Sequence, residues 1–224
     1  MVTAIILSGG RGKRLGAGIS KQYVKLQGKP ILQYTINQFM KNSMVDKIIL
    51  VLPKDEIDYC KTNVIDKYGL KIDKIVSGGS ERSESVYNAL TSISNTDTVL
   101  IHDGARPFVS QQIINNAIKY SQNYKAAAPG VVPKDTIKVR GSNGFSKETL
   151  ERDKLVAIQT PQAFDYKMIL EAHRKIRLLG ISVTDDTSVI EKIGKKVFLF
   201  DGEYNNIKIT TADDLILGEY LAKL

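Results

Sequence analysis

The stretch from Leu7 to Tyr23, LSGGRGKRLGAGISKQY, joins glycines to positive charge. It holds five glycines and four basic residues and contains no acid. Glycines let backbone N–H groups approach a ligand without interference from a Cβ atom, and such groups bind phosphate. The side chains of Arg11, Lys13, Arg14 and Lys21 add positive charge around that backbone. The pattern predicts a pocket for a polyphosphate.

The glycines match neither of two common nucleotide-binding motifs. The dinucleotide fingerprint G-x-G-x-x-G fits Gly10 and Gly12 but finds Leu15 at its third place, and no window fits G-x-x-x-x-G-K-[ST]. The loop, with Ser8 and Gly9 at its start, therefore indicates phosphate binding without naming either family. A turn that needs glycine for conformation alone is the alternative.

One acid stands where a metal ligand is expected. Asp103 ends the apolar run TVLIHD, and in open α/β sheets ligands bind beyond the carboxyl ends of the strands. A carboxylate there is suited to Mg²⁺, or it caps the next turn or pairs with Arg106. We interpret the neighbouring His102 as structural and expect His173 to be solvated. Cys60 lies in a helical pattern and is expected in the core.

The positive charge of the chain is concentrated near its start. The formal net charge is +8, and residues 1–45 carry seven Lys or Arg before the first acid, Asp46. A nucleic-acid-binding surface usually spreads basic residues over a face and interleaves aromatic ones, whereas this chain has no Trp. An anion pocket fits better, with a solvated basic surface as the alternative. We expect no nucleic-acid partner.

The composition is that of a globular protein in a reducing compartment. Of its residues 42% are hydrophobic and 25% charged, and there is one cysteine, so no internal disulfide forms. No apolar run approaches eighteen residues, and the first residues do not resemble a signal peptide. We expect a cytoplasmic location without membrane contact.

Apolar runs alternate with helical patterns, which predicts one α/β domain over residues 1–224. We expect a Rossmann-like, mainly parallel sheet with helices on both faces. Asp55 and Ser80 stand at expected helix N-caps. The predicted strands are 3–7, 47–52, 74–76, 98–101, 126–132, 196–200 and 206–210. The predicted helices are 31–41, 55–68, 81–94, 111–123, 165–179, 185–193 and 212–224.

The alternation breaks between Val132 and Gln159. In this stretch polar and apolar residues alternate on both sides of Asn143-Gly144, a pair that strongly favours a β-turn. We predict a projecting β-arm at about residues 134–157. Because a two-stranded ribbon is marginally stable alone, we expect a partner subunit to cover it and the protein to be a homodimer.

Several motifs occur in order and together resemble one family. They are SGGRGKRLG, SKQY, GGSERSESV, VLIHDGARPFV, VPKDTIK, QTPQAF, TDDTSVIEKIG and NIKITTADDL. The set is similar to the 2-C-methyl-D-erythritol 4-phosphate cytidylyltransferases over nearly the whole chain. Ribitol-5-phosphate cytidylyltransferases share several of these motifs and remain an alternative. A different class of alternative is a nucleotide- or RNA-binding module without catalysis.

The resemblance implies a reaction between CTP and a polyol phosphate, with Mg²⁺ as cofactor, and it implies roles for particular residues. Arg14, Lys21 and Lys208 match catalytic positions, and Asp103 matches a metal ligand. Asn205 stands where the family often has a second acid. The nucleotide positions are Ser8, Gly9, Gly10, Gly12, Gly78, Gly79 and Ser85. The acceptor positions are Arg152, Thr184 and Lys208, and Arg152 in the arm would complete the site of a neighbouring subunit.

Overall fold

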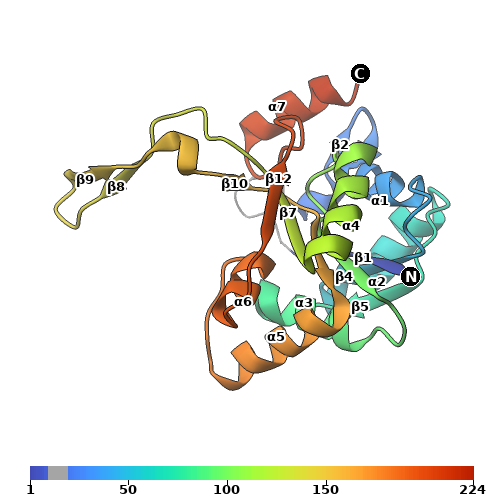
Figure 1. The fold of residues 1–224 in the computed structure, drawn as a ribbon. Helices are drawn as coiled ribbons and strands as arrows, with labels where there is room; N and C mark the ends of the chain where they lie inside the picture. The colour runs from blue at the N-terminus through green and yellow to red at the C-terminus, as the bar shows by residue number, and fades with distance from the viewer. Residues whose placement is uncertain (10–19) are drawn as a thin grey trace.

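The centre of the molecule is one twisted sheet, seen edge-on in Figure 1. The structure is a computed structural model that describes residues 1–9 and 20–224. Within these residues, eight strands form the sheet in the order β10-β7-β11-β6-β1-β4-β5, and β12 pairs with β7. The strands are β1 (Val2–Leu7), β4 (Lys47–Leu52), β5 (Lys74–Ser77), β6 (Thr98–Asp103), β7 (Ala126–Val131), β10 (Ala157–Ile158), β11 (Gln162–Asp165) and β12 (Phe198–Asp201).

The sheet is mainly parallel, which confirms the predicted fold class. Strand β1 is parallel to both β4 and β6, β4 is parallel to β5, and β7 is parallel to β12. The exceptions are β10 and β11, which run antiparallel to their neighbours. Strand β11 lies between β6 and β7, in a stretch where no strand is predicted.

Helices cover both faces because side chains alternate along the buried strands. Ala4 and Ile6 join the core under α1, α2 and α4, while Ile5 joins the core under α3, α5 and α6. Phe39 in the first core and Phe164 in the second are the largest fully buried side chains. The helices are α1 (Ile31–Met40), α2 (Ile57–Cys60), α3 (Arg82–Thr91), α4 (Gln111–Tyr124), α5 (Tyr166–Leu178) and α6 (Asp186–Lys192).

Two small elements close the end of the sheet where β1 and β6 finish. Strands β2 (Lys25–Leu26) and β3 (Lys29–Pro30) form a short hairpin, and α7 (Ala212–Leu221) packs beside it. Buried Leu26 and Ile209 form the core of this contact. The hairpin is not predicted from the sequence.

The predicted arm is present and projects away from the sheet (Figure 1). Strands β8 (Lys138–Arg140) and β9 (Ser146–Thr149) pair antiparallel, and every residue of β9 is exposed. The turn between them contains Gly144 at φ +86°, a conformation that glycine adopts without strain. At the tip, the side chain of Phe145 is 75% exposed.

Four sequence predictions of local structure are wrong. The helix predicted over 55–68 is broken into a 3₁₀ turn at Lys54–Glu56, the short α2 and a π-helical segment at Lys61–Asp66. Asp55 lies inside that 3₁₀ turn instead of capping a helix. The N-cap of α3 is Glu81, one residue after Ser80. Residues 206–210 form no strand. The N–H of Ile209 donates a hydrogen bond to the carbonyl of Ala105, but the segment does not pair with a strand of the sheet.

No helix within residues 1–9 and 20–224 is long and apolar enough to cross a membrane.

Candidate active site

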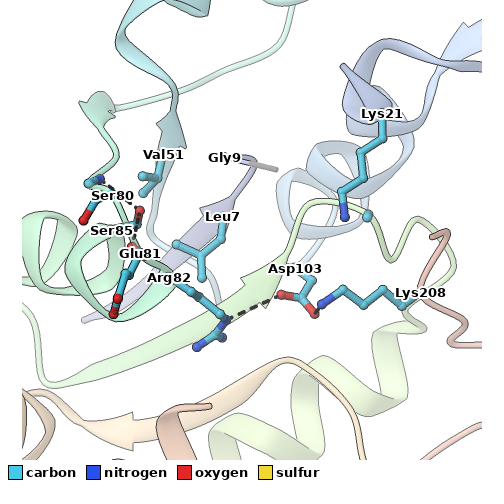
Figure 2. Close-up of a pocket in the computed structure, with 12 residues that line it drawn as sticks. Leu7, Gly9, Lys21, Val51, Ser80, Glu81, Arg82, Ser85, Asp103 and Lys208 are labelled. Carbon is cyan, nitrogen blue, oxygen red and sulfur yellow. Dashed lines mark hydrogen bonds and ion pairs between the residues drawn. The ribbon is translucent and has the colours of Figure 1, made fainter. Parts of the chain in front are cut away.

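A cavity of about 240 Å³ opens where β1, β4 and β6 end at their carboxyl ends (Figure 2). Its lining comes from the ends of these strands, the first turn of α3 and two loops that approach from other parts of the chain. The lining residues are Leu7, Gly9, Lys21, Val51, Gly79, Ser80, Glu81, Arg82, Ser85, Asp103, Ala105 and Lys208. The crevice is therefore in the position at which open α/β sheets bind ligands.

Asp103 lies at the centre of a cluster of cations. Its Oδ2 is 2.9 Å from Nζ of Lys208 and 3.6 Å from Nε of Arg106, and its Oδ1 is 3.9 Å from Nε of Arg82. In Figure 2, Arg82 and Lys208 approach this carboxylate from opposite sides. Asp103 thus pairs with Arg106, as one of the sequence-based alternatives predicts, and it also contacts Lys208 and Arg82.

The pKa of Asp103 is set by burial and by these cations. Burial alone would raise the pKa of a carboxyl group, but Lys208, Arg82 and Arg106 outweigh this effect and hold the pKa well below its usual range. The side chain is therefore a carboxylate at neutral pH. One buried negative charge fixes the positions of three positive ones.

Backbone hydrogen bonds hold the strand ends and loops around the cavity. The N–H of Ser8 donates to the carbonyl of Val51 at 2.9 Å, and the N–H of Gly104 donates to Leu7 at 2.8 Å. A Cβ atom at Gly104 would lie 2.8 Å from Oγ of Ser8, so only glycine permits this approach. Ser8 is buried.

The loop before α3 carries the predicted nucleotide residues Gly78, Gly79 and Ser85. The hydroxyl of Ser85 accepts from the N–H of Gly79 at 3.0 Å and donates to the carbonyl of Glu81 at 3.0 Å. A Cβ atom at Gly78 would lie 3.0 Å from Oγ of Ser85. Gly79 and Ser85 line the cavity, while Gly78 supports Ser85 from behind.

Lys21 enters the cavity from the side opposite to α3. It begins a 3₁₀ turn, Lys21–Tyr23, and its side chain points into the cavity on the side of Lys208 (Figure 2). Together the lining thus includes Lys21, Lys208 and Arg82 around the carboxylate of Asp103.

Other predicted site residues are not brought to the cavity in this chain. Arg152 is exposed in the arm, where its guanidinium donates to the carbonyl of Lys134 at 3.2 Å. Thr184 and Asn205 are exposed and are not among the lining residues. The predictions for Gly10, Gly12 and Arg14 fall on residues 10–19, outside the described residues.

A buried ion-pair network behind the cavity is not predicted from the sequence. Arg82 donates to Oδ2 of Asp186 at 2.7 Å, and Oδ1 of Asp186 is 3.2 Å from Nε2 of His173. The expectation that His173 is solvated is wrong, because its side chain is fully buried. The spacing Ile169, His173 and Ile176 would have placed it on the buried face of α5.

The structural interpretation of His102 agrees with the geometry. The ring is fully buried and packs on Phe39, and its nitrogens contact the carbonyl of Arg106 at 3.1 Å and Oγ1 of Thr160 at 3.0 Å. Burial lowers its pKa to about 4, so the ring is neutral near pH 7. It is absent from the cavity lining. Cys60 is buried in the core, as expected.

This arrangement is suited to binding and orienting a polyphosphate. The lining presents Lys21 and Lys208 on one side and the Gly79–Ser85 loop with Arg82 on the other, with glycine backbone at the end of β1. Positive charges that are fixed before a ligand binds stabilise developing negative charge without reorganisation. The geometry therefore favours transfer chemistry at phosphorus.

Neutralising Asp103 should weaken the fold at neutral pH. Since the pKa of Asp103 is lower in the folded than in the unfolded chain, its charge stabilises the fold above about pH 5, and this effect is lost as the pH falls toward the folded pKa. We expect Asp103→Asn to lower the free energy of unfolding by about 2 kcal/mol at pH 7 and by less near pH 3, where part of this stabilisation is lost. Denaturant unfolding across this pH range measures the difference. The exposed acid Asp66, changed to Asn, is the control; equal effects of D103N at both pH values would contradict the assignment.

The comparisons with known proteins agree along the whole chain. The family model of 2-C-methyl-D-erythritol 4-phosphate cytidylyltransferase matches residues 2–223. The enzyme of that name from Clostridium beijerinckii is 64% identical over 223 residues, which cover 100% of this chain and 99% of the relative. The one from Clostridium botulinum is 56% identical over 221 residues, covering 99% of each chain.

Solved structures show the same fold. The crystal structure of 4-diphosphocytidyl-2C-methyl-D-erythritol synthase from Anaerococcus prevotii aligns with a TM-score of 0.88 at 32% identity, over 100% of this chain and 96% of the other. That of 2-C-methyl-D-erythritol 4-phosphate cytidylyltransferase from Thermus thermophilus aligns with a TM-score of 0.80 at 26% identity, over 100% of each chain. The protein described here belongs to the 2-C-methyl-D-erythritol 4-phosphate cytidylyltransferase family.

Proposed function

We propose that this protein transfers CMP from CTP to 2-C-methyl-D-erythritol 4-phosphate and releases pyrophosphate. The observation that carries the proposal is the cavity in which Lys21 and Lys208 flank the buried carboxylate of Asp103, in a chain that matches this family over residues 2–223. The names of the relatives favour the methylerythritol acceptor over ribitol 5-phosphate.

The nucleophile is the phosphate of the acceptor. A phosphate monoester has a second pKa of about 6, so it is mostly dianionic at neutral pH and needs no protein base. One of its oxygens forms a bond to the α-phosphorus of CTP. The bond from that phosphorus to the bridging oxygen of the β-phosphate breaks, and pyrophosphate leaves with the electron pair.

The difficulty of this step is electrostatic, because two anions must meet. Lys21, with Arg14 as its expected companion, is assigned to the phosphates of CTP, and Lys208 to the acceptor phosphate as it approaches. Lys208 is half-exposed and can exchange its contact with Asp103 for a phosphate oxygen. Gly79 and Ser85 are assigned to the ribose and base. Catalysis then rests on position and fixed charge.

Asp103 also fits the expected magnesium ion. Magnesium is usually bound by one or two carboxylates together with phosphates and water, and Lys208 contacts Oδ2 of Asp103 at 2.9 Å, whereas Arg82 lies 3.9 Å from Oδ1. Those residues contain no cluster of three or more acids, histidines or cysteines that could hold a metal, so phosphates and water would supply the other ligands. The ion would neutralise charge on the triphosphate. The exposed Asn205 is not supported as a second ligand.

The arm supports a homodimer. Its strands are exposed, and apolar side chains at its base, including Val132, Val156, Leu199 and Tyr204, line a groove of about 280 Å³. Because Arg152 lies in the arm and not in its own chain's cavity, we assign it to the acceptor site of the partner subunit. Thr184 is assigned to that acceptor as well.

We place the enzyme in the cytoplasm, with small-molecule substrates and without nucleic-acid or membrane partners. The single cysteine, Cys60, is buried and free, which suits a reducing compartment. The cations that the structure does describe at the cavity surround a carboxylate within a pocket rather than a flat surface.

Pyrophosphate release from CTP tests the proposal. We expect release with 2-C-methyl-D-erythritol 4-phosphate, much slower release with ribitol 5-phosphate, and none after magnesium is removed by a chelator. Added Mg²⁺ should restore the rate. Equal rates with the two acceptors would contradict the assigned substrate, and full activity in the chelator would contradict the metal.

Replacing Lys21 should slow the chemical step. Because Lys21 places a positive charge in the cavity, we expect Lys21→Met to lower kcat by about 10²- to 10³-fold, as when an oxyanion-stabilising donor is lost. Steady-state pyrophosphate release measures this. The control is Lys25→Met, an exposed lysine four residues away. A K21M enzyme as fast as the control would exclude the role given to Lys21.

Mixing two inactive variants tests whether Arg152 acts across the dimer. Arg152→Ala and Lys21→Met each damage every site of their own homodimers. In a mixed dimer, however, one site would carry both changes and the other neither. After subunit exchange at equal amounts we expect about one quarter of the wild-type activity to return. No recovery, with exchange verified by mass, would show that Arg152 does not act in the partner's site.

A further inference from the structure

The carboxylate of Glu56 holds the two residues that flank Lys21. Its Oε1 accepts a short hydrogen bond from the hydroxyl of Ser20, and its Oε2 accepts from the side-chain amide of Gln22 at 2.6 Å. One side chain therefore clamps the turn on both sides of a cavity lysine.

Glu56 is itself fixed to the sheet. It ends the 3₁₀ turn Lys54–Glu56, which directly follows β4 and Pro53, and its N–H donates to the carbonyl of Pro53 at 3.0 Å. Strand β4 is buried and pairs with β1. The clamp thus connects the Lys21 turn to the same rigid strands that end at the cavity.

The turn is anchored on its other side by packing. The ring of Tyr23 lies 4.9 Å from the ring of Tyr59 in an edge-to-face contact, and Gln22 and Tyr23 are both buried. Ser20, which precedes the turn, is the first described residue after the glycine-rich segment. Its hydroxyl donates to Glu56, so this carboxylate helps to hold the chain at the start of the turn.

We propose that Glu56 is a positioning residue for Lys21. The Glu56 clamp, defined as Glu56 with Ser20 and Gln22, holds the backbone of the turn so that the Lys21 ammonium meets the phosphates of CTP. Glu56 is not in the cavity lining, so it acts through Lys21. This inference rests on the proposed function of the cavity. A displacement of about 1 Å at a catalytic group can lower a rate by about 100-fold.

Glu56 acts here through its hydrogen bonds and not through its charge, and substitutions can separate these two effects. In Glu56→Gln, the amide carbonyl can accept from Gln22 while the amide N–H donates to the oxygen of Ser20, since a hydroxyl both donates and accepts. Glu56→Gln can therefore keep both bonds and lose only the charge. Glu56→Ala loses both bonds. Asp58→Asn, an exposed acid two residues on, removes the same charge outside the clamp.

Steady-state kinetics of the full-length enzyme with CTP, 2-C-methyl-D-erythritol 4-phosphate and Mg²⁺ test this. We expect Glu56→Ala to lower kcat/KM by about 10- to 100-fold, Glu56→Gln by less than about threefold, and Asp58→Asn not at all. An E56Q loss as large as that of E56A would overturn positioning in favour of charge. An E56A enzyme at the wild-type rate would overturn the proposal outright.

A double-mutant cycle separates positioning from a general loss of structure. If Glu56 acts only through Lys21, adding Glu56→Ala to Lys21→Met should change kcat/KM by less than about twofold. A further loss as large as that of E56A alone would show that Glu56 acts elsewhere and would overturn the proposal. Thermal unfolding of each variant verifies that the compared enzymes are folded.

Two further measurements keep the test decisive. If Glu56→Ala does not fold, Ser20→Ala replaces it, because this change removes one hydrogen bond of the clamp at a site that is only partly buried. A loss of rate in Ser20→Ala that disappears in the K21M background supports the clamp. No loss of rate overturns the proposal. Wild-type enzyme in the same assay separates the two proposals. A wild type that forms no CDP-linked product refutes the function, while an active wild type with an active E56A refutes only the clamp.

Discussion

The site depends on one buried carboxylate, that of Asp103, at the end of β6. Burying an isolated charge is unfavourable, and here the unfavourable term is offset by Lys208, Arg106 and Arg82. The same contacts hold three cations together at the carboxyl end of β6, although the positive charges repel each other. A second buried acid, Asp186, shares Arg82 and extends the network to the helices behind. The cations of the cavity are thereby held in place for an anionic ligand.

The sheet determines where these charges meet. Strands β1 and β6 pair in register, so that Leu7 lies opposite Asp103 and the glycine-rich loop begins beside the carboxylate. The segment that carries Lys208 is brought back by the bond from Ile209 to Ala105, although Lys208 is far from Asp103 in the sequence. The arm leaves the sheet at β7 and β10, on the side away from β4 and β5. Arg152 therefore lies outside the cavity of its own chain.

Much of this could be predicted, because local patterns decide it. The buried strands β1, β4 and β6 are mainly apolar runs; the glycine-rich loop follows β1, and Asp103 is the last residue of β6. The predictions of local structure that were wrong concern segments whose structure depends on contacts with residues far away in the sequence. Strand β11 follows Pro161 and starts with Gln162, whose amide bonds Asp185 and Asp186, and no short-range pattern reveals such partners. Residues 206–210 look like a strand because Ile207 and Ile209 alternate, but these side chains pack beside α7 instead.

In the proposed reaction, fixed positive charge stabilises the transition state, and the protein forms no covalent bond to the nucleotide. Among the oxygen nucleophiles that line the cavity, Asp103 is held by cations and Ser85 by backbone groups. The stereochemical course at the α-phosphorus tests this most directly, with CTP made chiral there by a single sulfur. Direct attack by the acceptor phosphate predicts inversion of configuration in the CDP-linked product. Retention would require a protein-bound nucleotide intermediate and would contradict the account.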